Sequence, residues 1–317
     1  MPITYTNPVC PDYFADPFVW KVGQTYYAVG TGPRSADTSA PSRFPIKTSP
    51  DLVNWESHGW ALNAVDSKYL NDYWAPEIAF LDGVFYMYYS VGDPHRLHVA
   101  TSNLPLGPYT DIGEPITDES VTFAIDAHPF QDTDGKWYLF YCKDFLDSDD
   151  RIRAGTALVV DELVEMKRLA GKERVVARAT RDWQRFRANR PMYDGIYDWH
   201  TLEGASVLMH KGKYYCFYSG GCYENDTYGV DYVVADSVMG PYADDSPEAP
   251  RILRTVPGKV IGPGHNSFVT GPDGETCIVY HAWDEKMTAR RMCIDKLCWT
   301  DEGPTVIGPT STPQLIG

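Results

Sequence analysis

The stretch Gly135-Lys136-Trp137-Tyr138-Leu139-Phe140-Tyr141 places a glycine and a polar residue before a run of aromatic and aliphatic side chains. A glycine at a tight turn followed by such residues is typical of the second strand of a β-hairpin. The same pattern recurs four more times along the chain, at Gly23, Gly83, Gly212 and Gly274. These five hairpins decide the fold.

A short apolar run precedes each hairpin glycine, and a third strand with a turn-rich connection follows, as at residues 98–104. A small antiparallel sheet repeated along the chain is the signature of a β-propeller. The sequence therefore predicts an all-β, five-bladed β-propeller, and because the repeats account for nearly all 317 residues, a single domain over residues 1–317. A two-sheet β-sandwich is the structural alternative.

The composition narrows the function classes. The net charge of −15 argues against nucleic acid or an anionic membrane as a partner, because both require clustered Lys and Arg. No apolar run approaches the ~18 residues of a membrane span, and the N-terminal residues show no secretion signal. The seven cysteines lie mostly within apolar strands without a CxxC pair, so we expect reduced thiols, no structural zinc and a cytoplasmic location.

A polar residue stands near the start of the first strand in every repeat. Because the first strands of propeller blades line the central channel, we expect these side chains to converge at one depth on the axis. Buried charges are costly unless they are paired, so such a cluster indicates a functional site. The five residues are Asp16, Glu77, Asp126, Glu203 and His265.

Several carboxylates facing one cavity with aromatic walls suit the hydrolysis of a glycosidic bond. One carboxylate must stay ionised to activate water, and another must be protonated at neutral pH to reach the leaving oxygen. A third anion nearby raises the pKa of the proton donor, because it disfavours the charged form.

The motifs that carry these residues resemble those of glycoside hydrolase family 43, whose members are five-bladed β-propellers acting on xylan and arabinan chains. The resemblance covers essentially the whole chain, with one motif in each repeat. The motifs are Asn7-Pro8-Val9 with Ala15-Asp16-Pro17, Trp74-Ala75-Pro76-Glu77, Ile125-Asp126-Ala127-His128-Pro129, Glu203-Gly204, and Gly262-Pro263-Gly264-His265-Asn266-Ser267.

The resemblance implies a role for each of three carboxylates. Asp16 is expected to be the general base, Glu203 the general acid, and Asp126 the group that raises the pKa of Glu203 and orients it. The family inverts the anomeric centre in one displacement, which implies a base–acid separation of about 6.5–9.5 Å.

The resemblance also implies a set of substrate contacts, with Trp74 as a wall of the sugar pocket and His200 on the leaving-group side. Glu77 is expected either to touch the sugar or to support the site by hydrogen bonds. Of the neighbours Arg290 and Arg291, only one should enter the pocket, because adjacent residues of a strand face opposite ways, and we favour Arg290. The full set is Phe18, Trp74, Glu77, Ile125, His200, Arg290 and Arg291.

His265 resembles the family's axial histidine, which faces a central ion, often calcium and mostly held through water. The sequence predicts no organic cofactor and leaves the oligomeric state open.

These expectations add up to an inverting exo-glycosidase that releases a terminal pentose, β-D-xylose or α-L-arabinofuranose, from short xylo- or arabino-oligosaccharides. The segment 144–199 is expected to wall one end of the site and make a pocket of it. An endo- or exo-arabinanase of the same family and a non-catalytic carbohydrate-binding propeller are the alternatives.

Overall fold

The computed structural model describes residues 2–34, 43–63, 65, 72–118, 120–243 and 245–317. Over these residues the regular structure is β, apart from one 3-10 turn, η2, at Asp182–Gln184. No helix in the described part of the chain is long and apolar enough to cross a membrane. The all-β prediction is confirmed.

Three of the blades are separate four-stranded antiparallel sheets. The first blade contains β2 (Ala15–Val22), β3 (Thr25–Thr31), β4 (Pro45–Ser49) and β5 (Glu56–Trp60). The second contains β6 (Tyr73–Leu81), β7 (Val84–Val91), β8 (Arg96–Ser102) and β9 (Thr110–Asp111). The fifth contains β19 (Ile261–Thr270), β20 (Thr276–Trp283), β21 (Arg290–Thr300) and β22 (Gly303–Val306).

The third and fourth blades share one nine-stranded sheet. The third blade contains β10 (Ala124–Gln131), β11 (Trp137–Phe145) and β12 (Gly155–Val164), with the short strands β13 (Arg168–Leu169) and β14 (Arg174–Ala177) paired to β12. The fourth contains β16 (Gly195–His210), β17 (Lys213–Gly220) and β18 (Gly229–Ala235), with β15 (Arg185–Met192) paired to β16.

A short parallel bridge between β12 and β16 joins these two blades, where Gly155 faces His200 and Thr156 faces Thr201. A Cβ atom on Gly155 would lie only 1.9 Å from the carbonyl oxygen of His200, so the close approach of the two backbones requires glycine. The prediction that all of 144–199 forms a wall is therefore wrong for β12 to β14, which belong to the third blade.

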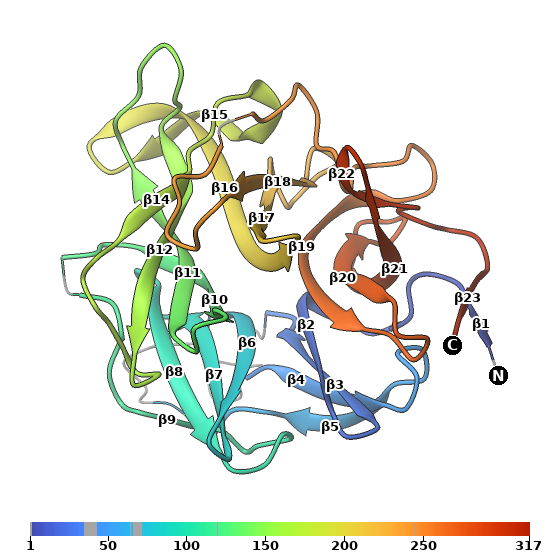
Figure 1. Cartoon of the computed structure of the whole chain (residues 1–317). Helices are drawn as coiled ribbons and strands as arrows, with labels where there is room; N and C mark the ends of the chain where they lie inside the picture. Colours follow the sequence, from blue (N-terminus) through green and yellow to red (C-terminus); the bar gives the residue numbers. More distant parts are fainter. Residues whose placement is uncertain (1, 35–42, 64, 66–71, 119, 244) are drawn as a thin grey trace.

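Figure 1 shows the five blades arranged around a common axis, with the first strand of each blade innermost. These first strands contact one another in a ring, in the order β2, β6, β10, β16 and β19 and back to β2. The five aromatic segments predicted from the sequence form the second strands, β3, β7, β11, β17 and β20. The five-bladed β-propeller is confirmed.

The two ends of the chain meet beside the fifth blade. Strand β1 (Ile3–Tyr5) pairs with β23 (Gln314–Ile316), and both termini lie on the same side of Figure 1. The Asn7 side chain donates to the backbone oxygen of Ile294 at 2.8 Å and accepts its N–H at 2.9 Å. The segment before the first blade thereby binds the last blade and closes the ring.

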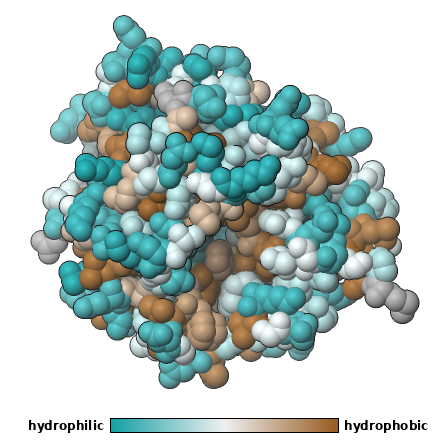
Figure 2. Space-filling model, in the orientation of Figure 1, coloured by the Kyte–Doolittle hydropathy of each residue, from teal (hydrophilic) through white to brown (hydrophobic). Residues whose placement is uncertain are grey.

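Figure 2, in the same orientation, shows a molecule hollowed at its centre, with hydrophilic side chains spread over the periphery.

Candidate active site

A β-bulge interrupts the first strand of every blade, where the register shifts against the second strand. The bulge residue has a positive φ in each case, and four of the five are not glycine. Non-glycine residues in this left-handed region are strained and cluster at functional sites. They are Asp16 (48°), Ala75 (46°), Asp126 (59°), Gly204 (60°) and His265 (50°).

The backbone N–H of each bulge residue is lost from the ladder and is captured by a side chain of the preceding blade. In four blades the acceptor is on the second strand: Ser90 accepts from Asp126, Ser219 from His265, Thr31 from Ala75 and His281 from Asp16, at 2.7–3.1 Å.

The third blade has Cys142 at the equivalent position of its second strand, opposite Ile125. A thiol is a weak acceptor, and the N–H of Gly204 instead donates to Oδ2 of Asp126 at 3.0 Å. This exchange of partners ties the Asp126 carboxylate to the backbone next to Glu203.

The bulges also correct the predicted alignment of the repeats. Glu203 precedes its bulge residue by one position and Glu77 follows Ala75 by two, so four carboxylates and a histidine do not share one depth. The prediction of one shared depth is wrong because the number of residues between the bulge and the hairpin glycine differs among the blades.

Glu77 contacts a histidine of the third blade and supports the ring of strands. Its Oε2 lies 2.6 Å from Nδ1 of His128, and Nε2 of His128 accepts the N–H of Val207 at 3.1 Å. Because Nε2 is an acceptor, Nδ1 carries the proton and donates to Glu77. Glu77 and His128 therefore link the second, third and fourth blades.

The bulge ends of the first strands surround a cavity of about 420 Å³. It contains seven of the predicted site residues, together with residues from the flanking loops. The predicted residues are Asp16, Trp74, Ile125, Asp126, Glu203, His265 and Arg290, and among the others are Tyr13, Thr31, Tyr223, Glu224 and Trp283.

Four predicted residues lie outside this cavity. Glu77 has been described, and Phe18 lines a second cavity of about 600 Å³ toward the far ends of the first strands. His200 is buried, with Nδ1 2.9 Å from the carbonyl oxygen of Asp198. Arg291 pairs with Asp284 at 3.1 Å, on the opposite face of β21 from Arg290, as strand alternation requires.

Asp16 lies among cationic and imidazole groups. Nη1 of Arg290 donates to its Oδ1 at 3.1 Å, and Nδ1 atoms of His281 and His265 lie 3.2 and 3.4 Å from the same oxygen. Burial opposes ionisation, but Arg290 first, and then His265, hold the pKa of Asp16 well below its usual range. The carboxylate is therefore ionised at neutral pH.

Arg290 is itself fixed in place. Its Nε and Nη2 donate to Oη of Tyr13 at 3.3 and 3.0 Å, and its guanidinium lies 4.9 Å from the ring centre of Tyr223. Arg290 lines the cavity and Arg291 does not.

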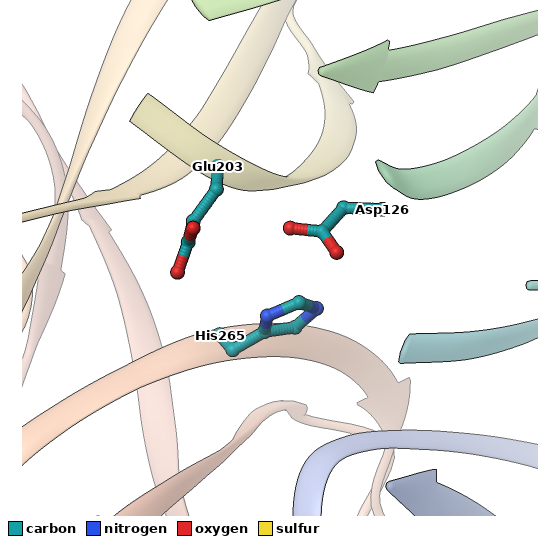
Figure 3. Close-up of side chains that lie close together, drawn as sticks. All are labelled: Asp126, Glu203 and His265. Carbon is teal, nitrogen blue, oxygen red and sulfur yellow. The ribbon is translucent and has the colours of Figure 1, made fainter. Parts of the chain in front are cut away.

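Glu203 has the opposite electrostatic setting. Burial first, and then the charge of Asp126, raise its pKa to about 7, while a hydrogen bond from Tyr228 opposes the rise. Burial also raises the pKa of Asp126, against the effect of His265. Figure 3 shows the side chains of Asp126, Glu203 and His265 pointing toward one another from three strands. Glu203 therefore favours the protonated form more strongly than a carboxyl group in water does.

Donor atoms of Asp126, Glu203 and His265 lie within 4.8 Å of one another, close enough to share a metal ion. Calcium takes six to eight oxygen ligands, and a set with one imidazole and a carboxyl group held partly protonated does not fit direct binding of that ion. The axial calcium therefore stays a prediction from the resemblance.

Sequence reasoning missed Tyr13, Tyr228, His281 and His95, whose ring stacks on Trp74 with centroids 3.5 Å apart. Two signals were available. His281 stands seven residues after its hairpin glycine, the repeat position that holds Ser90 and Ser219 in other blades. Gly264 is the other, since a glycine inside a strand indicates the close approach of another group, which here is Tyr228.

Comparisons with known proteins agree with this geometry. The model of glycosyl hydrolases family 43 matches residues 5–304. A β-D-galactofuranosidase of Aspergillus niger is 32% identical over 94% of this chain and 83% of its own. An extracellular exo-α-(1→5)-L-arabinofuranosidase of Streptomyces avermitilis is 26% identical over 96% of this chain, which spans 63% of that relative.

Among solved structures, a thermostable family-43 glycoside hydrolase is 34% identical and aligns over 98% of both chains with a TM-score of 0.83. An endo-1,4-β-xylanase of Bacteroides thetaiotaomicron is 29% identical over 97% of this chain, with a TM-score of 0.77. The chain belongs to glycoside hydrolase family 43, and it is a glycosidase that acts on carbohydrate.

Proposed function

We propose that this glycosidase is an inverting, exo-acting enzyme that releases a terminal pentose, β-D-xylose or α-L-arabinofuranose, from short xylo- or arabino-oligosaccharides. One observation carries the proposal: two carboxyl groups with opposite protonation preferences, Asp16 and Glu203, face the same cavity of about 420 Å³. A single-displacement hydrolysis needs such a pair.

In this mechanism each group performs one proton transfer. Asp16, held ionised by Arg290, removes a proton from the attacking water as it adds to the anomeric carbon. Glu203 gives its proton to the oxygen of the leaving sugar. The charge of Asp126 supports the protonated form of Glu203 before the reaction.

Exo action is supported by a hairpin of the fourth blade that lies against residues lining the cavity. The hairpin of β15 and β16 contacts two cavity-lining residues: Phe186 lies 6.2 Å from Tyr223 between ring centres, and Arg187 lies 3.3 Å from Glu224. Such a buttress suits a pocket for a chain end better than a cleft open at both sides. An endo- or exo-arabinanase is the alternative within the same mechanism.

A second candidate sugar is β-D-galactofuranose, because the relative in Aspergillus niger is a β-D-galactofuranosidase at 32% identity. Its ring has the configuration of α-L-arabinofuranose with one more exocyclic carbon. A pocket that accepts the one ring accepts the other if there is room for that carbon.

The proposal is tested by measuring kcat/KM in parallel on aryl β-D-xyloside, aryl α-L-arabinofuranoside and aryl β-D-galactofuranoside, and on xylobiose, arabino-oligosaccharides and linear arabinan. Higher kcat/KM on either pentoside and on oligosaccharides than on arabinan supports it. Preference for the galactofuranoside would replace the pentose, and random internal cleavage of arabinan would replace exo action.

A further inference from the structure

We propose that Tyr228 is a positioning residue for the general acid: its hydroxyl occupies Oε1 of Glu203 and so reserves Oε2 for the proton that goes to the leaving group. The inference rests on the proposed function of Glu203. Oη of Tyr228 lies 2.6 Å from Oε1 of Glu203, the distance of a strong O–H to carboxyl hydrogen bond.

The position of this hydroxyl is fixed by the packing of its ring. Tyr228, which directly precedes β18, is 1% exposed, and its ring lies parallel to His281 with centroids 5.7 Å apart and planes 8° apart. Gly264 also lies against this ring, since a Cβ atom there would lie 2.2 Å from Cε1 of Tyr228. Any other residue at Gly264 would displace the ring, so the glycine of the Gly262-Pro263-Gly264-His265 motif makes room for it.

The direction of the hydrogen bond follows from the donors present. Among the residues that the structure describes, Glu203 is the hydrogen-bond partner of the Tyr228 hydroxyl. Burial, and next the charge of Glu203, raise the pKa of Tyr228, so the hydroxyl keeps its proton and donates it. In a protonated carboxyl group the carbonyl oxygen is the better acceptor, which makes Oε1 the carbonyl oxygen and places the acidic proton on Oε2.

The same ring also connects the acid to the base. His281, on which Tyr228 stacks, has its Nδ1 3.1 Å from the backbone nitrogen of Asp16 and accepts that N–H. The ring that contacts Glu203 and the ring that contacts Asp16 are therefore stacked on each other. This arrangement sets the proton donor relative to the water that Asp16 activates.

The test is Tyr228→Phe, which keeps the ring and removes the hydroxyl. Wild type and variant are compared on aryl glycosides of the preferred sugar with leaving groups from dinitrophenol to unsubstituted phenol. Poor leaving groups need protonation and good ones do not. We expect kcat/KM to fall about 10- to 100-fold on the phenyl glycoside and to stay nearly constant on the dinitrophenyl glycoside.

Two further variants make the outcome specific. Tyr218→Phe removes an equally buried hydroxyl that bonds Ser246 and Gln184 instead of Glu203, and it should leave the dependence on leaving group unchanged. Glu203→Gln should steepen it. If Glu203→Gln steepens it and Tyr228→Phe does not, the role of Tyr228 is refuted while the proposed function stands. If Glu203→Gln has no such effect, the proposed function fails, and the inference fails with it.

Discussion

Asp16 and Glu203 differ in neighbours more than in burial, and the neighbours decide their protonation. Arg290 lies 3.1 Å from Asp16, whereas Glu203 has the carboxyl group of Asp126 beside it. Removing either group should abolish a proton transfer. We expect Asp16→Ala and Glu203→Ala to lower kcat on phenyl glycosides by roughly 10²–10⁴-fold or more, with unchanged circular dichroism. Activity near wild type in either variant would refute the assignment.

The role of Asp126 predicts a shift in pH dependence. As the proposed general acid, Glu203 has to be protonated, so activity should fall as the pH rises through its pKa of about 7. In Asp126→Asn the amide oxygen can still accept the N–H of Gly204, but the charge that raises the pKa of Glu203 is gone. The alkaline limb of the profile of kcat/KM against pH should therefore move to lower pH. A limb that moves to higher pH would contradict this role.

Substitutions of Arg290 and Arg291 can be compared for their effect on the acid limb of the profile of kcat/KM against pH. As the proposed general base, Asp16 has to be ionised, so activity should fall as the pH drops through its pKa. Arg290→Met removes the positive charge that lowers the pKa of Asp16 most. The pKa of Asp16 should therefore rise, and the acid limb should move to higher pH. In Arg291→Met, which breaks only the pair with Asp284, the limb should stay in place. Equal shifts in both variants would show a non-specific effect.

At the scale of the strands, the bulge places the chemistry. Each first strand turns at a residue of positive φ, and that turn aims Asp16, Asp126 and His265 into one cavity. The sequence predicts these strands well because glycine and aromatic residues mark the hairpins. The sequence does not reveal the bulges, because the residue type of Ala75 does not mark it as the bulge residue of its strand. For this reason Glu77 was expected at the depth of the other four axial residues, and Phe18 was expected among the substrate contacts, whereas Phe18 lines the second cavity.

The bridge between β12 and β16 gives a prediction for a single glycine. Gly155→Ala would place a Cβ atom 1.9 Å from the oxygen of His200, so β16 must move away from β12. We expect the free energy of unfolding to fall by about 1–3 kcal/mol, with lower kcat because β16 carries Glu203. Urea denaturation and steady-state kinetics measure the two effects. Unchanged stability would show that the two strands can separate without cost.

At the scale of the whole molecule, the ring brings together residues that are far apart in sequence. The repeats and the order of their motifs were enough to predict the propeller and to bring Asp16, Asp126 and Glu203 together, while Arg290 came from the family resemblance. Tyr13 and Tyr228 could not be found in either way. Their roles depend on which neighbouring ring or backbone atom they meet after the blades close, and a single repeat contains no information about that contact.

The ring also places base and acid on blades that are not neighbours, since the fifth blade separates the first from the fourth. The central claim is that Asp16 activates water while Glu203 protonates the leaving group in one displacement. Proton NMR of the sugar released in the first minutes of hydrolysis tests it most directly. A single displacement requires the first anomer formed to have the configuration opposite to that of the substrate. A first product of the same configuration would require a covalent intermediate and would contradict it.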